Sequence, residues 1–316
     1  MKFSLTTFML AIILVANAQQ DRQLSFYSFD GMSFNPAITG FEGYSGTMIY
    51  RNQWDKVENA PNTTLFNFQG NSNNIITNRL PGAVGVGLSF YNDVIGQMKQ
   101  NNFKLNGAYH IKTPVGKFSA GFGLGFLQMV IDGEWIAPDT PVLFDPTISG
   151  LMNKVGESRF DLNFGLHYAN RYGYVGFSTT HMSQSAFQQL SMESARHYYV
   201  LAGTSFGVGA GQRFKLKPSV LIKADGATAI FDLNVRAEHA LANNRSVWIG
   251  TTYRFSYGLG LMAGTSMGGL HLGYSFEWMT NPMKVWGRGS HEFMLRYEIF
   301  PAPKPITGTS CPHILY

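Results

Sequence analysis

Two ladders of alternate polar residues lie in the second half of the chain: the first is Asp232, Asn234, Arg236 and Glu238, and the second is Glu292, Arg296 and Glu298. Residues at i and i+2 of a β-strand share one face, so each ladder presents its charges on a single side. Inside a barrel such a ladder could select solutes or clasp a plug. The charges could also simply neutralise one another in a wet lumen.

The remaining polar residues form no catalytic or metal-binding motif. The eight histidines are scattered, with no HExxH or paired metal spacing, and no G-x-S-x-G stretch occurs. Glycines at 121, 123 and 125 repeat with a period of two and lack the strand–turn–helix context of a nucleotide-binding loop. We therefore expect no enzyme activity, no cofactor and no metal. An enzyme in the barrel wall remains a third function class, because catalytic triads are defined by geometry rather than by residue order.

A further cluster is the stretch "RNQW", which consists of Arg51, Asn52, Gln53 and Trp54. Arg offers five hydrogen-bond donors, and Trp combines an apolar ring with one donor. The cluster is a candidate site at the barrel rim that docks a protein partner. Alternatively, Trp54 belongs to an aromatic belt at the membrane interface and Arg51 is satisfied inside the barrel.

The elements that position these residues are strands with one apolar and one polar face. The alternation is clear at residues 118–126, 160–168, 229–238, 269–279 and 290–299. We expect the apolar faces to contact lipid, and this set includes Leu270, Leu272, Phe276, Phe122, Leu124, Phe164, Leu166, Phe231 and Leu233. Mid-strand charges on the polar faces point to a lumen.

The pattern predicts an all-β fold, a transmembrane antiparallel β-barrel of about 14 strands. The expected strands are 41–54, 62–70, 82–92, 98–111, 117–131, 159–169, 172–182, 196–207, 214–224, 227–238, 245–254, 258–267, 269–279 and 289–300. Their number is even, and several have the roughly 10 residues that a tilted strand needs to cross a bilayer.

Composition agrees with a membrane barrel. Charged residues make up 14% of the chain, against about 25% in soluble domains. The chain contains 35 glycines, and aromatic residues make up 14% of it. Its net charge is +5, but the sequence has no cluster of basic residues that would suit nucleic acid. A single cysteine, Cys311, excludes an internal disulfide framework.

The chain divides into four segments. Residues 1–18 carry Lys2, an apolar run and an Ala-Asn-Ala site, which predicts a cleaved signal peptide. We expect residues 19–40 to form a periplasmic N-terminal lead-in, 41–300 the barrel and 301–316 a periplasmic tail. The protein is then exported and inserted in the outer membrane as a multi-pass barrel.

The longest predicted connection, residues 132–158, is too apolar for a loop that only floats in water. It holds Trp135, Ile136, Leu143 and Phe144 among other apolar residues. Such a loop could fold inward and constrict the lumen, or it could join Arg51 and Trp54 in a surface that receives a partner chain. We favour the partner surface and expect deletion of residues 136–153 to leave assembly intact.

Several blocks resemble the PorP/SprF family of membrane proteins. They are Asn35-Pro36-Ala37 with Gly40, "YRNQW" at 50–54, "GVGLSFYNDVIG" at 85–96, "YVGFSTTHM" at 174–182, "FDLNVRAEHA" at 231–240 and "GSHEFMLRYEI" at 289–299. They occur in order and cover essentially the whole chain after the signal peptide. The resemblance implies an outer-membrane barrel tied to type IX secretion and gliding motility in Bacteroidota.

The resemblance also implies partners. These are a secreted, adhesin-like protein with a C-terminal sorting domain, periplasmic secretion-ring proteins, or both. The favoured function is a barrel accessory that engages such a protein for export or surface attachment. The alternative is a passive or substrate-selective porin. The sequence leaves open which partner is bound, whether the lumen is open or plugged, and the oligomeric state.

Overall fold

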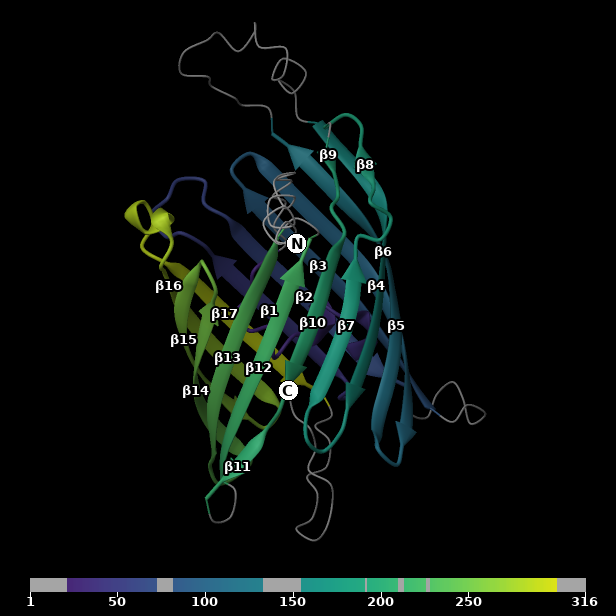
Figure 1. The fold of residues 1–316 in the computed structure, drawn as a ribbon, viewed down its shortest axis with the longest axis vertical. Helices are drawn as coiled ribbons and strands as arrows, with labels where there is room; N and C mark the ends of the chain where they lie inside the picture. Colours follow the sequence, from purple (N-terminus) through teal and green to yellow (C-terminus); the bar gives the residue numbers. More distant parts are fainter. Residues whose placement is uncertain are drawn as a thin grey trace, which may run out of the picture.

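The wall of the molecule is a closed barrel of fourteen antiparallel strands (Figure 1). The structure, a computed structural model, describes residues 22–72, 82–132, 155–190, 192–209, 213–225 and 228–299. The wall strands are β1 (Ser45–Asn52), β2 (Asn62–Asn71), β3 (Gly82–Ile95), β4 (Met98–Thr113), β5 (Gly116–Ile131), β6 (Val155–Ala169), β7 (Tyr174–Thr180), β10 (His197–Gly203), β12 (Phe214–Ala224), β13 (Ala229–Ala240), β14 (Arg245–Arg254), β15 (Gly258–Met267), β16 (Leu270–Met279) and β17 (Ser290–Glu298). Each pairs with its neighbours in chain order, and β1 pairs with β17 to close the ring. The predicted 14-stranded barrel is confirmed.

Smaller elements lie in the connections. The hairpin of β8 (Ala186–Phe187) and β9 (Met192–Glu193) lies between β7 and β10, and the short helix η5 (Pro282–Val285) lies between β16 and β17. The strand expected at 196–207 is divided, because β10 ends at Gly203 and β11 (Phe206–Val208) pairs only with β12. The described residues include no helix that is both long and apolar enough to cross a membrane.

Burial alternates along the strands as their side chains alternate between faces. Of the nine residues expected to contact lipid, Leu272, Phe122, Leu124, Leu166, Phe231 and Leu233 are exposed, and Leu270, Phe164 and Phe276 are half-buried on the same outward face. Inward neighbours such as Asp161, Ser275 and Glu277 are buried. An apolar outer wall with a polar inner wall is the pattern of a membrane barrel.

The two ends of the barrel differ in their connections. Strands β4 and β5 are joined at one end by Pro114 and Val115 alone, and β15 and β16 are joined there by Gly268 and Gly269. Both Ser45, where the wall begins, and Glu298, where it ends, lie at this same end. At the other end, residues 132–154 join β5 to β6, and residues 280–289 join β16 to β17. Short turns are typical of the periplasmic side, so we call the first the periplasmic end and the second the outer end.

The lumen is occupied by the segment Arg22 to Gly40, which we call the plug. It contains two short helices, η1 (Gly31–Ser33) and η2 (Pro36–Ile38). All of its residues except Phe29 are buried. The plug contacts eight strands of the wall: β3, β5, β6, β7, β12, β13, β16 and β17. These strands lie all around the closed ring, and one short segment can reach them all only from inside the barrel.

This position corrects the expected periplasmic lead-in, at least from residue 22 onward. The physical reason is that inward glycines of the wall leave room for the plug backbone. A Cβ added at Gly121 would lie 2.4 Å from the Ala37 nitrogen, and one added at Gly85 would lie 1.9 Å from the Thr39 carbonyl oxygen. Gly121 of β5 and Gly85 of β3 therefore form part of the surface on which the plug lies, whereas Gly123 and Gly125 face wall residues.

Candidate functional site: the plugged lumen

Glu292 joins the plug to the barrel wall. This fully buried β17 carboxylate accepts hydrogen bonds from the Ser25 backbone N–H, at 2.8 and 3.0 Å, and from the Phe26 N–H, at 2.9 Å. Arg51 of β1 donates to the same carboxylate at 2.8 Å and to the Ser25 hydroxyl at 3.2 Å. The pairing of β1 with β17 sets Arg51 directly opposite Glu292. One carboxylate thus connects the plug to both strands of the closure seam.

The Arg51–Glu292 pair is one end of a longer chain of ion pairs that runs along the inner face of the wall. Arg51 Nη2 lies 3.4 Å from Glu277 of β16, and Arg254 of β14 lies 3.0 Å from the same carboxylate. Arg254 also lies 2.8 Å from Asp232 of β13, which lies 3.0 Å from Lys223 of β12. We call these six residues the charge chain. Its three positive and three negative side chains balance, as buried charges must.

Inward glycines on β15 let the charge chain continue along the inner face of the wall. β15 lies between β14 and β16, and its inward positions here are Gly258 and Gly260. Because neither has a side chain, Arg254 reaches over β15 to Glu277. Arg254 also donates to the Gln23 side chain at 3.1 Å. The plug therefore takes part in the charge chain at two places, Gln23 and Ser25.

Asn35 fixes the middle of the plug against β6 and β7. Its amide nitrogen donates to the carbonyl oxygens of Leu166, at 2.9 Å, and Phe177, at 3.3 Å. Its side-chain oxygen accepts from the Ala37 N–H at 2.9 Å, which caps η2. The next residue, Pro36, begins η2, where a missing N–H costs no hydrogen bond. The Asn-Pro-Ala block is thus both a helix cap and a clamp on the wall.

Further polar contacts hold the chain where it leaves the lumen at the periplasmic end. His110 Nε2 lies 2.9 Å from the Thr39 carbonyl oxygen. Lys117 donates to the Phe41 carbonyl at 2.6 Å and lies over the Phe41 ring. Arg296 donates to the Phe29 carbonyl at 2.9 Å. Cationic or imidazole side chains therefore bind the backbone of the plug and of Phe41, the residue that follows it.

Apolar contacts also join the plug to the wall. Leu24, Phe26, Tyr27, Phe34 and Ile38 of the plug share one buried cluster with inward residues of the wall that include Trp248, Tyr199 and Leu201. Burial raises the pKa of Tyr27, whose hydroxyl donates to the Ser219 carbonyl. Burial also raises the pKa of Asp30, although hydrogen bonds from Ser33 and Asn67 oppose the shift. The described residues contain no group of three or more His, Cys, Asp and Glu side chains able to hold a metal ion.

The predicted ladders point into this lumen. Asp232, Asn234, Arg236, Glu292 and Arg296 are buried on the inward face. Glu238 and Glu298 lie on the same face nearer the periplasmic end and are half-buried. The first ladder contributes Asp232 to the charge chain, while Arg236 lies over the Phe29 ring of the plug, 3.9 Å from its centroid.

The predicted partner site at "RNQW" needs correction. Arg51 is 0% exposed and Gln53 is 8% exposed, so neither can dock an external partner. Arg51 faces inward on β1, and Gln53, one residue past the end of β1, has the same parity. Asn52 is half-buried, and Trp54 is half-buried with its indole N–H donating to the Tyr257 hydroxyl at 2.9 Å. The other partner candidates, Trp135, Ile136, Leu143 and Phe144, lie outside the described residues.

Sequence reasoning gave no site role to Arg254, Glu277 or the plug residues Gln23, Ser25 and Asn35, although Asn35 belongs to a block that carries the family resemblance. Glu277 and Arg254 both occupy polar positions of alternating strands, which was a usable signal. Nothing in the alternation pointed to the plug, because residues 22–40 have no strand or helix period.

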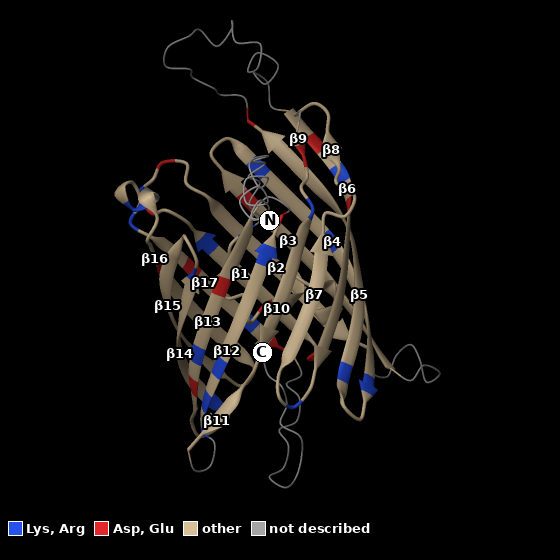
Figure 2. Ribbon diagram, viewed as in Figure 1, with Lys and Arg blue, Asp and Glu red and all other residues tan. Residues whose placement is uncertain are grey.

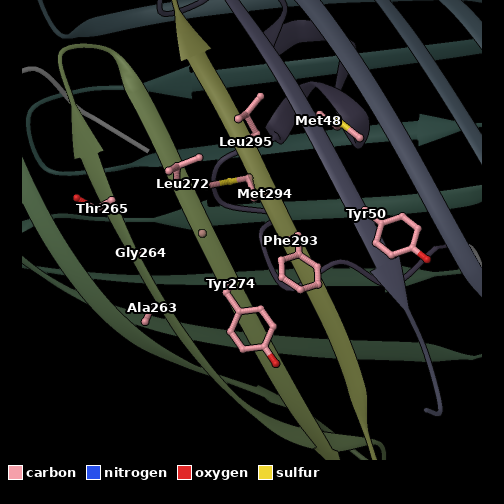
Figure 3. Close-up of a pocket in the computed structure, with 11 residues that line it drawn as sticks. Met48, Tyr50, Ala263, Gly264, Thr265, Leu272, Tyr274, Phe293, Met294 and Leu295 are labelled. Carbon is pink, nitrogen blue, oxygen red and sulfur yellow. The ribbon is translucent and has the colours of Figure 1, made fainter. Parts of the chain in front are cut away.

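The outer wall carries a shallow apolar groove that belongs to a different surface. Figure 3 shows it between two rows of outward side chains on β1, β16 and β17, with small residues of β15 at one end. One row is Tyr50, Phe293 and Tyr274, and the other is Met48, Leu295 and Leu272. The groove lies on the apolar outer face of the barrel and shares no residue with the charge chain.

Comparison with known proteins gives one family and several barrels of low identity. The family model described as "Type IX secretion system membrane protein PorP/SprF" matches residues 16–297. No curated protein matches.

Among solved structures, the Pseudomonas putida toluene transporter TodX is 10% identical, with 88% of this chain and 93% of that chain covered and a TM-score of 0.49. The Ralstonia pickettii toluene transporter TbuX is 10% identical, with coverages of 84% and 92% and a TM-score of 0.48. BamA from Haemophilus ducreyi, lacking POTRA domains 1–3, is 8% identical, with coverages of 81% and 70% and a TM-score of 0.44. At these values the similarities say nothing about what this chain binds.

Proposed function

Because the chain belongs to the PorP/SprF family of type IX secretion system membrane proteins, we propose that this outer-membrane barrel engages a protein rather than a solute. The partner is a secreted, adhesin-like protein with a C-terminal sorting domain or a subunit of the periplasmic secretion machinery. The barrel serves its export or its attachment to the cell surface, including the surface display that gliding motility requires.

The plugged lumen is the observation that carries this proposal. A passive porin needs a continuous water-filled path, whereas here the interior holds the plug from Arg22 to Gly40, fixed by Glu292, Asn35 and His110. Buried, hydrogen-bonded polar contacts of this kind are costly to break. A porin that conducts along this path would have to displace the plug, so the occupied lumen supports a role at the barrel surfaces.

The outer end offers an apolar surface that suits a protein contact. In the β16–β17 connection, Val285 and Trp286 are 77% and 75% exposed. The Arg288 N–H donates to the Asp55 carbonyl at 3.1 Å, which fixes this connection against the one between β1 and β2. Exposed Trp residues are enriched among the residues that dominate protein interfaces. We place one partner contact at Val285 and Trp286.

Affinity capture from native outer membranes tests the proposal. A tagged barrel should recover a secreted protein with a C-terminal sorting domain or a periplasmic secretion subunit, identified by mass spectrometry after mild cross-linking. Val285→Ser with Trp286→Ser should lower the yield of a surface partner, whereas Tyr172→Ser, an exposed aromatic at the periplasmic end, should not. Recovery of no partner, together with steady ion conductance in planar bilayers, would instead support the porin.

A further inference from the structure

The periplasmic end of the barrel is strongly basic. Four exposed cations and one half-buried cation lie at its turns and strand ends: Lys112, Arg171, Arg213, Arg245 and Lys215. We call these five residues the basic collar. Figure 2 shows Lys and Arg gathering at the lower end of the barrel, near β11 and the β4–β5 turn.

The acidic residues at this end do not neutralise the collar. Only Glu42, Glu238 and Glu298 occur there among the described residues, and each is already paired. Glu42 lies 3.0 Å from Arg296, Glu238 lies 2.7 Å from Lys217, and Glu298 Oε1 lies 3.3 Å from His271. The segments 73–81, 210–212 and 300–316 lie outside the described residues, and their sequences contain Arg79 and Lys304 but no Asp or Glu.

The outer end differs, because its charges are mixed and partly paired. Lys99 lies 3.3 Å from Asp132, and Arg159 contacts Glu157. Exposed or half-buried acids there include Asp55, Glu58 and Glu193. The positive excess is therefore a property of one end, not of the whole surface.

Two like-charge pairs within the strands make the periplasmic excess costly. Lys112 is directly opposite Lys117 in the β4–β5 pair, and Lys217 is directly opposite Arg236 in the β12–β13 pair. Like charges directly opposite in an antiparallel pair destabilise the sheet. Lys217 is already paired with Glu238 and Arg236 lies buried over the Phe29 ring, so the Lys112–Lys117 pair is the one that an anion from outside the chain would stabilise.

We propose that this mouth binds an acidic polypeptide segment of a periplasmic partner. The inference rests on the proposed function, since it names the chemistry of the machinery that the barrel engages. Anionic lipid headgroups fit less well. Lys112 and Lys215 continue the inward rows of β4 and β12, so their ammonium groups point to the mouth rather than to the surrounding bilayer. A polypeptide that approaches along the barrel axis reaches both.

A binding measurement with a defined acidic probe tests the inference. The purified full-length barrel in phosphatidylcholine nanodiscs should bind a fluorescein-labelled oligoglutamate peptide and not an oligolysine peptide of the same length. Affinity should fall as salt rises, because exposed charges are screened beyond a Debye length of about 10 Å at 0.1 M salt. Lys112→Glu combined with Lys215→Glu should weaken binding by roughly tenfold or more, since reversal replaces attraction with repulsion.

The matched control is Lys56→Glu combined with Lys284→Glu, which changes net charge equally but at the outer end, where both lysines are exposed. It should bind the peptide as the wild type does. Equal loss in the control, or unchanged binding in the collar variant, overturns the proposal. Loss of peptide binding in phosphatidylglycerol nanodiscs alone also overturns it, because lipid headgroups then occupy the collar. Should the collar variant fail to fold, Lys112→Gln with Lys215→Gln gives the same comparison with a milder change.

Failure of this inference is distinguishable from failure of the proposed function. If the wild-type barrel captures a secretion partner from membranes and the collar variant captures it equally well, the function stands and the acidic contact is wrong. If the wild type captures nothing, the proposed function itself fails.

Discussion

The carboxylate of Glu292 meets three groups that the chain supplies from far apart. Ser25 and Phe26 come from the plug, and Arg51 comes from the first strand, 241 residues before Glu292. The inward direction of Glu292 and Arg296 follows from strand parity alone. The Arg51–Glu292 pair does not, because it depends on the register between the first and last strands, which local sequence does not encode. Sequence reasoning therefore predicted the face of these residues but not their partners.

Arg51→Met should destabilise the barrel strongly. The change leaves Glu277 and Glu292 buried with less positive charge to compensate them, and breaking a buried pair costs about 3–5 kcal/mol. We expect urea unfolding in detergent micelles, followed by tryptophan fluorescence, to occur at clearly lower urea. Met48→Leu, an outward substitution of similar volume on the same strand, should leave the midpoint unchanged. Equal midpoints for Arg51→Met and the wild type would mean that the charge chain contributes little.

Asp30 should make the stability of the plugged barrel depend on pH. Burial raises the pKa of Asp30 above its ordinary value. A carboxyl with a raised folded-state pKa favours the folded state most below its unfolded pKa, and that contribution is lost as pH rises through the folded pKa. The temperature of heat modification in gel electrophoresis should therefore fall with rising pH over that window. Asp30→Asn should flatten this part of the profile, and an unchanged profile would exclude Asp30 as its source.

At the scale of elements, periodicity predicted the strands well, because a two-residue repeat directly records which face meets lipid. The expected ranges at 117–131, 214–224, 245–254 and 258–267 differ from the observed strands by at most one residue at either end. The plug escaped prediction for the converse reason. Its residues have no repeat, since they are surrounded by wall on all sides and have no solvent-facing face.

Gly121→Val should loosen the plug while leaving the wall intact. Any Cβ at this position would lie 2.4 Å from both the Ala37 nitrogen and the Pro36 carbonyl carbon, so the η2 region must move. We expect higher conductance in planar bilayers and faster proteolysis of the segment before β1. Gly107→Val provides the control, because Gly107 of the neighbouring strand faces outward and a Cβ there meets nothing within 4 Å. Identical conductance in the two variants would show that the plug contact is unimportant.

Leu272→Arg should impair assembly because Leu272 is an exposed residue of the outward face of β16. A cation at mid-bilayer depth costs about 2–4 kcal/mol in barrels. The heat-modifiable form in outer membranes should decrease. His271→Arg places the same charge one residue earlier on the inward side, close to Glu298, and should assemble normally. Normal assembly of Leu272→Arg would contradict the assignment of this face to lipid.

At the scale of the whole molecule, the width of the barrel does not decide whether it conducts. A barrel of this width can enclose a channel, but here the plug occupies the lumen. Strand number could be predicted from sequence, and fourteen strands exceed the eight that side chains alone can fill. Whether the interior was open could not be predicted, because that depends on where an aperiodic segment lies.

Deletion of residues 22–40 should therefore convert the protein into a channel. The wall keeps its strand pairings, while the groups that bind the plug, such as Glu292 and His110, become exposed to water. Liposome swelling with small sugars should be rapid for the deletion variant and slow for the wild type, and the variant should show reduced thermal stability. Slow swelling of a correctly assembled deletion variant would mean that other segments close the lumen.

The contact between β1 and β17 also sets an order of events in biogenesis. The ring can close only after the last strand is in place, because closure requires β1 to pair with β17. By then the plug, which precedes β1 in the chain, has long been present. We therefore expect the barrel to close around the plug rather than to receive it afterwards through a finished mouth. The plug and the β1–β17 pair then become ordered in a single step. In that step Glu292 of the last strand accepts the hydrogen bonds from Ser25 and Phe26.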